Sequence, residues 1–214
     1  MATTFILVRH GESEANYNGI FAGNFDADLQ ERGLLQAEKT AEYIFKNYKV
    51  DKVYASDLKR AYKTGKCFAD MAGVEIVKSS QLREISAGEW DGKKFSDVMK
   101  IYEKDYEVWL SDIGNARCTG GESVKELGER VMGELLKIAK ENEGKTVLIA
   151  THATPIRVTQ TLIQNGDLTD MKNIPWVSNA SVSVFEYENN VWNILKISED
   201  SHLGELKTTL PKNV

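Results

Sequence analysis

Short apolar runs alternate along this chain with longer segments whose apolar residues recur at helical spacing. The runs occupy residues 4–8, 52–55, 74–77 and 146–150. The helical segments occupy residues 31–48 and 57–72 and a third stretch that begins after Ser123. This alternation is typical of an α/β domain with a largely parallel sheet. Two later runs, 181–185 and 191–197, flank Asn189 and Asn190 and predict an antiparallel hairpin added to that sheet.

The helical segments carry recognisable start and stop signals. Asp28 with Glu31 predicts a capping box for the helix over 31–48, and Ser123 with Glu126 predicts another for the third helix. Gly73 is expected to end the helix over 57–72. The inward face of the first helix is expected to contain Leu34, Ala37, Ala41, Ile44, Phe45 and Tyr48.

The chain of 214 residues is expected to form a single domain over 1–214. No segment repeats, and no linker rich in Pro, Gly or Ser divides the sequence. The least regular part, 85–121, is expected to be an irregular segment that packs over the functional site.

The overall charge limits the partners that the chain can attract. A formal net charge of -5 gives no general attraction to nucleic acid or to an anionic membrane, so neither is expected as a partner. No apolar segment approaches the roughly 18 residues that cross a bilayer. Two cysteines without CxxC spacing give no disulfide framework. We therefore expect a cytoplasmic protein that captures anionic ligands in a local basic pocket.

Two of the three histidines lie just after apolar runs. Arg9 and His10 follow the first run, and His152 follows the run that ends at Thr151. Ser56 follows the run at 52–55 and opens the segment that contains Arg60. In doubly wound sheets, ligands bind beyond the carboxyl ends of the strands. These side chains are therefore expected to meet in one crevice.

Two imidazoles and two guanidiniums suit a phosphoryl group better than other common ligands. Guanidinium groups bind phosphate oxygens through paired hydrogen bonds and keep their charge at any working pH. The same charges are expected to lower the pKa of His10 and so keep its ring neutral and nucleophilic. Attack by a ring nitrogen on phosphorus would give a phosphohistidine that water then opens. A zinc site is not expected, because no ligand pair has metal-site spacing.

Five blocks, in this order, resemble the motifs of the histidine phosphatase superfamily, also called the phosphoglycerate mutase-like family. They are Arg9-His10-Gly11-Glu12 with Asn16; Ser56-Asp57-Leu58-Lys59-Arg60-Ala61 with Thr64; Leu82-Arg83-Glu84 with Gly88, Trp90 and Gly92; Gly120-Gly121-Glu122-Ser123; and Thr151-His152 with Ile156-Arg157. The resemblance covers most of the chain. It implies a three-layer α/β/α sandwich of the phosphoglycerate mutase-like type.

The resemblance also implies a role for each matched residue. His10 would be the nucleophile, assisted by His152. Glu84 would start protonated, give its proton to the leaving oxygen and then accept one from the attacking water. The phosphoryl oxygens would be held by Arg9, Asn16, Arg60, His152 and the backbone amide of Ala153. No metal and no cofactor is implied, because the arginines and histidines neutralise the charge that magnesium would otherwise meet.

Two positions depart from the family pattern. Ala153 stands where glycine is usual after the second histidine, and a positive φ there would strain an alanine. Gln30 stands where threonine is common and is expected to affect only the cap of the following helix. Neither departure removes a catalytic group.

Three functions fit such a crevice. A phosphatase would pass the phosphoryl group to water, a cofactor-dependent phosphoglycerate mutase would return it to the substrate, and a non-catalytic module would only bind it. Residues 85–92 resemble the phosphatase branch, including the α-ribazole-phosphate and broad-specificity types. The intact set of His10, Arg60, Glu84 and His152 argues against a binding module. We therefore expect a metal-independent phosphomonoesterase that acts on a small phosphorylated metabolite, such as α-ribazole 5′-phosphate or a sugar phosphate.

Two questions stay open at the level of sequence. The preferred substrate depends on the segment from Ser86 to Gly121, whose aromatic residues either line a pocket or pack in the core: Trp90, Phe95, Tyr102, Tyr106 and Trp109. The free edge of the predicted hairpin would allow two copies to pair, so a homodimer is one expectation.

Overall fold

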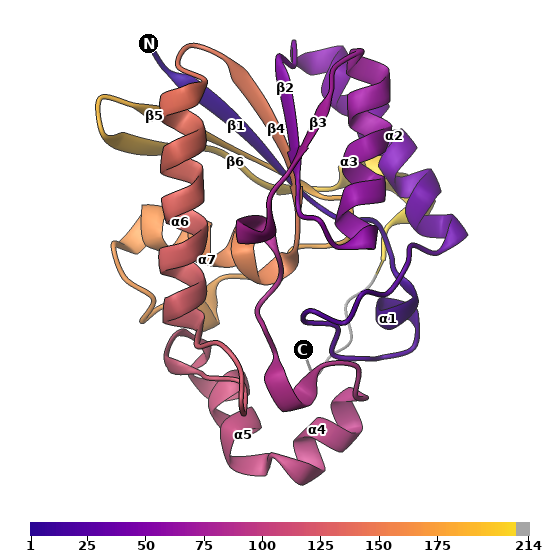
Figure 1. Cartoon of the computed structure of the whole chain (residues 1–214), viewed down its shortest axis with the longest axis vertical. Coiled ribbons are helices and arrows are strands. Elements are labelled where there is room, and N and C mark those ends of the chain that lie inside the picture. The colour runs from indigo at the N-terminus through magenta and orange to yellow at the C-terminus, as the bar shows by residue number, and fades with distance from the viewer. Residues whose placement is uncertain (209–214) are drawn as a thin grey trace.

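The computed structural model describes residues 1–208 and shows one six-stranded sheet with helices on both faces (Figure 1). The strands are β1 (Thr3–Arg9), β2 (Lys52–Ala55), β3 (Ile76–Lys78), β4 (Thr146–Thr151), β5 (Val182–Glu188) and β6 (Val191–Glu199). Their order across the sheet is β3-β2-β4-β1-β5-β6. The first four strands run parallel, whereas β5 runs antiparallel to both β1 and β6. The predicted parallel sheet with an antiparallel C-terminal hairpin is confirmed.

Seven α-helices accompany the sheet within residues 1–208. They are α1 (Glu14–Tyr17), α2 (Glu31–Asn47), α3 (Lys59–Ala72), α4 (Phe95–Ile101), α5 (Glu103–Ser111), α6 (Val124–Glu141) and α7 (Ala153–Asn165). The end of the expected domain, residues 209–214, lies outside the described part of the chain.

Alternate residues of β1 enter two separate cores. Phe5 and Leu7 pack in the core that holds the apolar faces of α6 and α7, while Ile6 and Val8 pack with α2 and α3. Successive side chains of a strand point to opposite faces, so a strand that is apolar at every position needs helices on both sides. The three-layer α/β/α sandwich follows directly from this uninterrupted apolar run.

The two predicted capping boxes have different outcomes. Ser123 and Glu126 form the predicted box at the start of α6, with side-chain to backbone bonds of 3.2 and 2.9 Å. The box predicted for Asp28 is wrong, because α2 begins after Gln30, whose side chain makes no capping bond. The Asp28 carboxylate instead lies 2.7 Å from Nζ of Lys63 and is neutralised there.

The inward face of α2 is the predicted one at Ala37, Ala41 and Ile44, which are buried, and at Phe45 and Tyr48, which pack partly buried against the same core, but not at Leu34. Leu34, expected in the core, is 45% exposed. The helix instead turns Gly33 toward the chain that follows His10, where a Cβ on Gly33 would lie 2.1 Å from the carbonyl oxygen of Glu12. Only glycine allows this close backbone approach. The helix therefore supports the segment after β1 directly.

The prediction of an irregular segment over 85–121 is wrong, because the segment contains α4 and α5. Figure 1 shows both helices at the lower end of the molecule, away from the strands. They are short, they adjoin at Tyr102, and α5 buries only Tyr106 and Trp109. So few inward positions leave little helical periodicity in the sequence.

The hairpin turn has the predicted chemistry. Asn189 and Asn190 have φ angles of 51° and 63°, the pair of left-handed residues that a type I′ turn requires. The pairing of β6 with β5 shifts register on both sides of Val184, so the free edge of the sheet is bulged.

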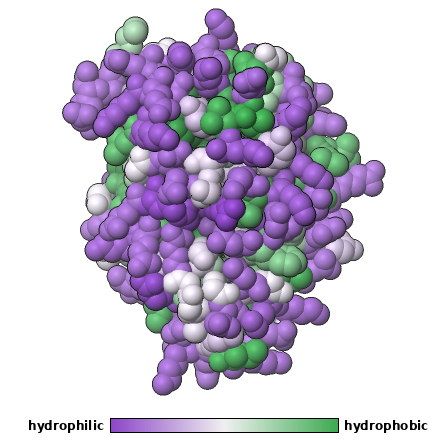
Figure 2. Space-filling model, in the orientation of Figure 1, coloured by the Kyte–Doolittle hydropathy of each residue, from purple (hydrophilic) through white to green (hydrophobic). Residues whose placement is uncertain are grey.

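The surface seen in this orientation is mainly hydrophilic, with hydrophobic atoms in separate small groups (Figure 2). None of the helices within residues 1–208 has the length and apolar character needed to cross a membrane.

Candidate active site

Three neighbouring strands end at one edge of the sheet and bring the predicted residues together. Arg9 of β1 pairs with Thr151 of β4, so His10 and His152 follow side by side. The backbone amide of His10 donates to the carbonyl of Thr151 at 2.9 Å. The two imidazole rings meet edge to face, with centroids 5.1 Å apart. The in-register ends of β1 and β4 therefore determine the distance between the two histidines.

The hydrogen bonds of His10 determine its tautomer. Nδ1 lies 2.7 Å from the carbonyl oxygen of Gly11, an acceptor only, so Nδ1 carries the ring proton. Nε2 accepts a hydrogen bond from Nε of Arg60 at 3.2 Å and so carries the lone pair. Burial and the charges of Arg60 and Arg9 hold the pKa of His10 well below its usual value. His10 is therefore a neutral imidazole whose Nε2 can act as a nucleophile.

The two arginines beside His10 are buried and fixed by backbone carbonyls. Arg60 donates to the carbonyls of Phe25 at 2.9 Å and Gly23 at 2.7 Å. Arg9 donates through one terminal nitrogen to the carbonyl of Val177 at 2.6 Å, while its Nε has no partner within residues 1–208. Burial lowers the pKa of each guanidinium to about 10, so both stay charged at neutral pH. Both arginines keep donors that a phosphoryl group could use.

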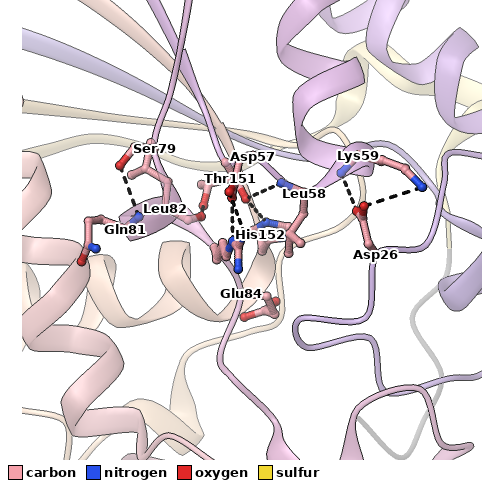
Figure 3. A network of polar contacts seen from close by, with 12 residues as sticks. Asp26, Asp57, Leu58, Lys59, Ser79, Gln81, Leu82, Glu84, Thr151 and His152 are labelled. Carbon is pink, nitrogen blue, oxygen red and sulfur yellow. Dashed lines mark hydrogen bonds and ion pairs between the residues drawn. The ribbon is translucent and has the colours of Figure 1, made fainter.

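The side chain of Glu84 contacts the beginning of α7 and lies near His152 (Figure 3). Its carboxylate accepts from the backbone amides of Ile85 at 3.0 Å and Thr154 at 3.4 Å. His152 is the N-cap of α7 and Ala153 is its first residue. The strain expected at Ala153 does not arise, because its φ is not positive.

The segment that carries Glu84 is held from two sides. Oγ1 of Thr151 donates to the carbonyl of Leu82 at 2.7 Å, which ties the segment to β4 (Figure 3). On the other side, Arg130 of α6 donates to the carbonyl of Glu84 at 3.3 Å and forms a two-pronged ion pair with Glu122, both contacts at 2.9 Å. The helical pattern of 124–141 gives no sign of this role for Arg130.

The side chain of Asn16 is oriented by several hydrogen-bond donors around its Oδ1 atom. Its Oδ1 accepts from the backbone amide of Ser13 at 3.1 Å and from Nδ2 of Asn179 at 3.0 Å. The side-chain nitrogen of Asn16, Nδ2, is therefore the group that can donate to a ligand. Asn179 also donates to the carbonyl of His10 at 3.1 Å, so it supports both residues. No sequence motif marks Asn179 as a neighbour of His10.

One pocket contains all but one of the predicted site residues, namely Arg9, His10, Asn16, Arg60, Glu84 and Ala153. His152 is fully buried behind it, with Nε2 2.9 Å from Oγ of Ser56 and with no partner for Nδ1 within residues 1–208. Within residues 1–208, no group of three or more His, Cys, Asp or Glu side chains could hold a metal ion.

The aromatic residues of the middle segment divide between pocket and core. Phe95 and Trp109 line the pocket together with Phe21 and Trp176. Trp90 and Tyr106 are buried in the core. The sequence pattern could not separate these two sets.

Comparison with known proteins identifies the family to which the chain belongs. The profile of the histidine phosphatase superfamily (branch 1) matches residues 5–200. Phosphoserine phosphatase 1 of Hydrogenobacter thermophilus is 35% identical over 200 residues, covering 94% of each chain. A metal-independent phosphoserine phosphatase of Arabidopsis thaliana is 32% identical over 206 residues, covering 95% of this chain and 84% of that one. Bacillus stearothermophilus YhfR has the same fold, with a TM-score of 0.89 at 23% identity over 94% of this chain and 99% of that one. This chain therefore belongs to the histidine phosphatase superfamily and is a phosphatase.

Proposed function

We propose that this phosphatase hydrolyses phosphomonoesters through a phosphohistidine formed on Nε2 of His10. The observation that carries the proposal is the state of His10, a neutral ring whose unprotonated nitrogen lies against a buried guanidinium. A nucleophile of this kind needs no base to activate it. The adjacent charges of Arg9 and Arg60 stabilise the phosphoryl group as it is transferred.

In the first step, the phosphoryl group binds between the two arginines, with Asn16 and the backbone amide of Ala153 as neutral donors. A phosphoryl oxygen accepts the Nε–H of Arg60 in place of His10, which frees the lone pair of Nε2. That lone pair forms the P–N bond while the P–O bond to the alcohol breaks. The protonated carboxyl of Glu84 gives its proton to the leaving oxygen, so the alcohol departs neutral.

In the second step, the carboxylate of Glu84 accepts a proton from water, and the water oxygen attacks phosphorus. The P–N bond breaks and its electrons return to Nε2 of His10. Inorganic phosphate leaves and Glu84 is again protonated. His152 supports both steps if Ser56 donates its hydroxyl proton to Nε2 of the ring. Nδ1 of His152 then carries the proton and can donate to a phosphoryl oxygen.

A phosphoglycerate mutase would share the nucleophile but retain the phosphoryl group for a second substrate hydroxyl. Phosphate release separates the two functions. We expect stoichiometric phosphate from simple alkyl phosphates without metal or bisphosphate primer. We also expect His10→Ala to abolish it. Isomerisation of 3-phosphoglycerate without net phosphate release would contradict the proposal.

The role of Glu84 has a separate test. Glu84→Gln should lower kcat/KM, which reports formation of the phosphohistidine, far more for alkyl phosphates than for aryl phosphates, because only the poorer leaving group needs protonation. Equal losses on both classes would remove Glu84 from the acid role.

The small phosphorylated metabolite itself belongs to this proposal. The relatives named phosphoserine phosphatases support a small phosphomonoester as the substrate. That the substrate is α-ribazole 5′-phosphate or a sugar phosphate stays a prediction. A single domain, a cytoplasmic location and the lack of nucleic-acid partners also remain predictions. A homodimer is a further prediction, and the bulged edge of β6 makes that edge a poor pairing surface.

A further inference from the structure

One wall of the pocket is aromatic. Phe21, Phe95, Trp109 and Trp176 line the pocket that also contains His10. They come from three separate parts of the chain: the loop after α1, helices α4 and α5, and the segment before β5. These aromatic side chains are not needed to bind a phosphoryl group, whose donors are the arginines and amides already described. Their chemistry therefore bears on the alcohol part of the substrate.

The wall is built as a fixed surface around Phe21. The Phe21 ring meets Phe95 at 5.5 Å and Trp109 at 5.3 Å between centroids, in both cases edge to face. These are favourable geometries for aromatic pairs. The backbone of Phe21 also exchanges hydrogen bonds of 2.8 and 3.0 Å with Lys93 and Gly92. This pairing ties the loop after α1 to the segment that leads into α4.

Trp176 is fixed independently. The guanidinium of Arg157 lies 4.1 Å from the centre of the Trp176 ring. Arg157 in turn donates to the carbonyl of Ile174 at 2.8 Å and of Met171 at 2.9 Å, so it is itself immobilised. Trp176 also contacts Trp109, with centroids 6.2 Å apart.

The wall has a buried layer and a layer that a ligand can reach. Phe21 and Trp109 are buried, whereas Phe95 and Trp176 are half-buried. When a flat apolar group of a ligand lies against Phe95 and Trp176, apolar surface of the ligand and of these two side chains is removed from water. The pocket is also lined by Glu12, whose carboxylate opposes a second anionic group on the substrate.

We propose that the pocket selects phosphomonoesters whose alcohol carries an uncharged aromatic ring, over esters whose alcohol carries a carboxylate. This inference rests on the proposed function. It assigns Phe95 and Trp176 as specificity-determining residues. The proposed preference differs from the one that the names of the phosphoserine phosphatase relatives indicate for those proteins.

The test compares alkyl phosphates with the same ester linkage: 3-phenylpropyl phosphate, propyl phosphate and phosphoserine. Burial of one phenyl ring should raise kcat/KM for the phenylpropyl ester about 30-fold over the propyl ester. Phosphoserine should be no better than propyl phosphate. Free 3-phenylpropanol should inhibit competitively, whereas propanol should not.

Variants locate the effect in the wall. Trp176→Ala and Phe95→Leu should each reduce the phenylpropyl-to-propyl ratio several-fold, and general damage to the site cancels in that ratio. Tyr187→Ala is the control, because Tyr187 pairs with Thr3 at the opposite end of β1 from His10. It should keep the wild-type ratio.

The outcomes separate the inference from the function beneath it. Equal kcat/KM for the phenylpropyl and propyl esters, or a preference for phosphoserine, would overturn the inference. The phosphatase mechanism would still stand if phosphate release from these esters depended on His10. Failure of His10→Ala to reduce phosphate release from any of the three esters would overturn the mechanism itself.

Discussion

Replacement of Arg130 by methionine should damage catalysis through Glu84 rather than through the phosphate site. Arg130 donates to backbone carbonyls in the segment 81–84, at 2.7 Å for Gln81. It also forms an ion pair with Glu122. Glu122 also accepts from the backbone amide of Ser86 at 3.1 Å. The chain on both sides of Glu84 therefore depends on one guanidinium.

The structure sets the size of the effect. Hydrogen bonds to charged groups contribute roughly 1.5–3 kcal/mol each when well formed. Only the 2.7 Å bond to Gln81 and the 2.9 Å pair with Glu122 are short, and the two charged side chains are 19% and 15% exposed. Methionine also keeps the packing of the aliphatic stem. We therefore expect a loss of roughly 3 kcal/mol in the free energy of unfolding.

The loss in rate should depend on the leaving group. A displacement of about 1 Å in a catalytic group costs on the order of 100-fold in rate. We expect that loss in kcat/KM for an alkyl phosphate and less than about 10-fold for an aryl phosphate, which needs little protonation.

Urea denaturation and steady-state kinetics on both substrates measure these effects. Arg117→Met is the matched control, since Arg117 pairs with Glu126 near the start of the same helix but is more than half exposed. It should change neither quantity appreciably. If Arg130→Met lowers both rates equally, Arg130 supports the fold without positioning Glu84, and the reasoning is refuted.

Three further predictions concern the two buried histidines, Ser56 and Gly33. Burial and nearby positive charge hold the pKa of His10 and His152 well below 6.5, so the unfolded chain binds more protons below that pH. Stability should therefore fall as pH drops from 6.5, by up to about 1.4 kcal/mol per pH unit for each ring; urea midpoints that stay flat would contradict this. Ser56→Ala should lower kcat about 10-fold by removing the partner of His152, and Ser56→Thr should restore it; full activity of the alanine variant would argue against the partner role. Gly33→Ala should destabilise the fold, because its Cβ would lie 2.1 Å from the Glu12 carbonyl, and thermal melting checks it; an unchanged Tm would show that the backbone can yield there.

Much of the site follows from the sequence because it lies at strand ends. A run that is apolar at every position is typical of a central strand, and ligand sites in such sheets lie beyond the carboxyl ends of the strands. His10 and His152 follow two such runs, and the parallel pairing of β1 with β4 puts them together. The family motifs then supplied Glu84, which no periodicity could connect to that edge.

The parts that the sequence did not predict depend on contacts between distant segments. Asn179, Arg130 and Trp176 lie far along the chain from the groups they support, and each looks like an ordinary surface or packing residue on its own. The position of Leu34 depends on a backbone contact at Gly33 that hydrophobic spacing does not encode. Tertiary contact overrides local pattern at each of these positions.

The most direct test of the mechanism is to trap the phosphorylated enzyme. A substrate labelled in its phosphoryl group, mixed with enzyme and quenched within milliseconds, should give labelled protein that is stable in base and labile in acid. Peptide mapping should place the label on His10, and His10→Ala should carry none. Under the same quench, Glu84→Gln should accumulate more label from an aryl phosphate, because it forms the intermediate but opens it slowly. A label on another residue, or turnover with no label at all under conditions that resolve a single turnover, would contradict the account.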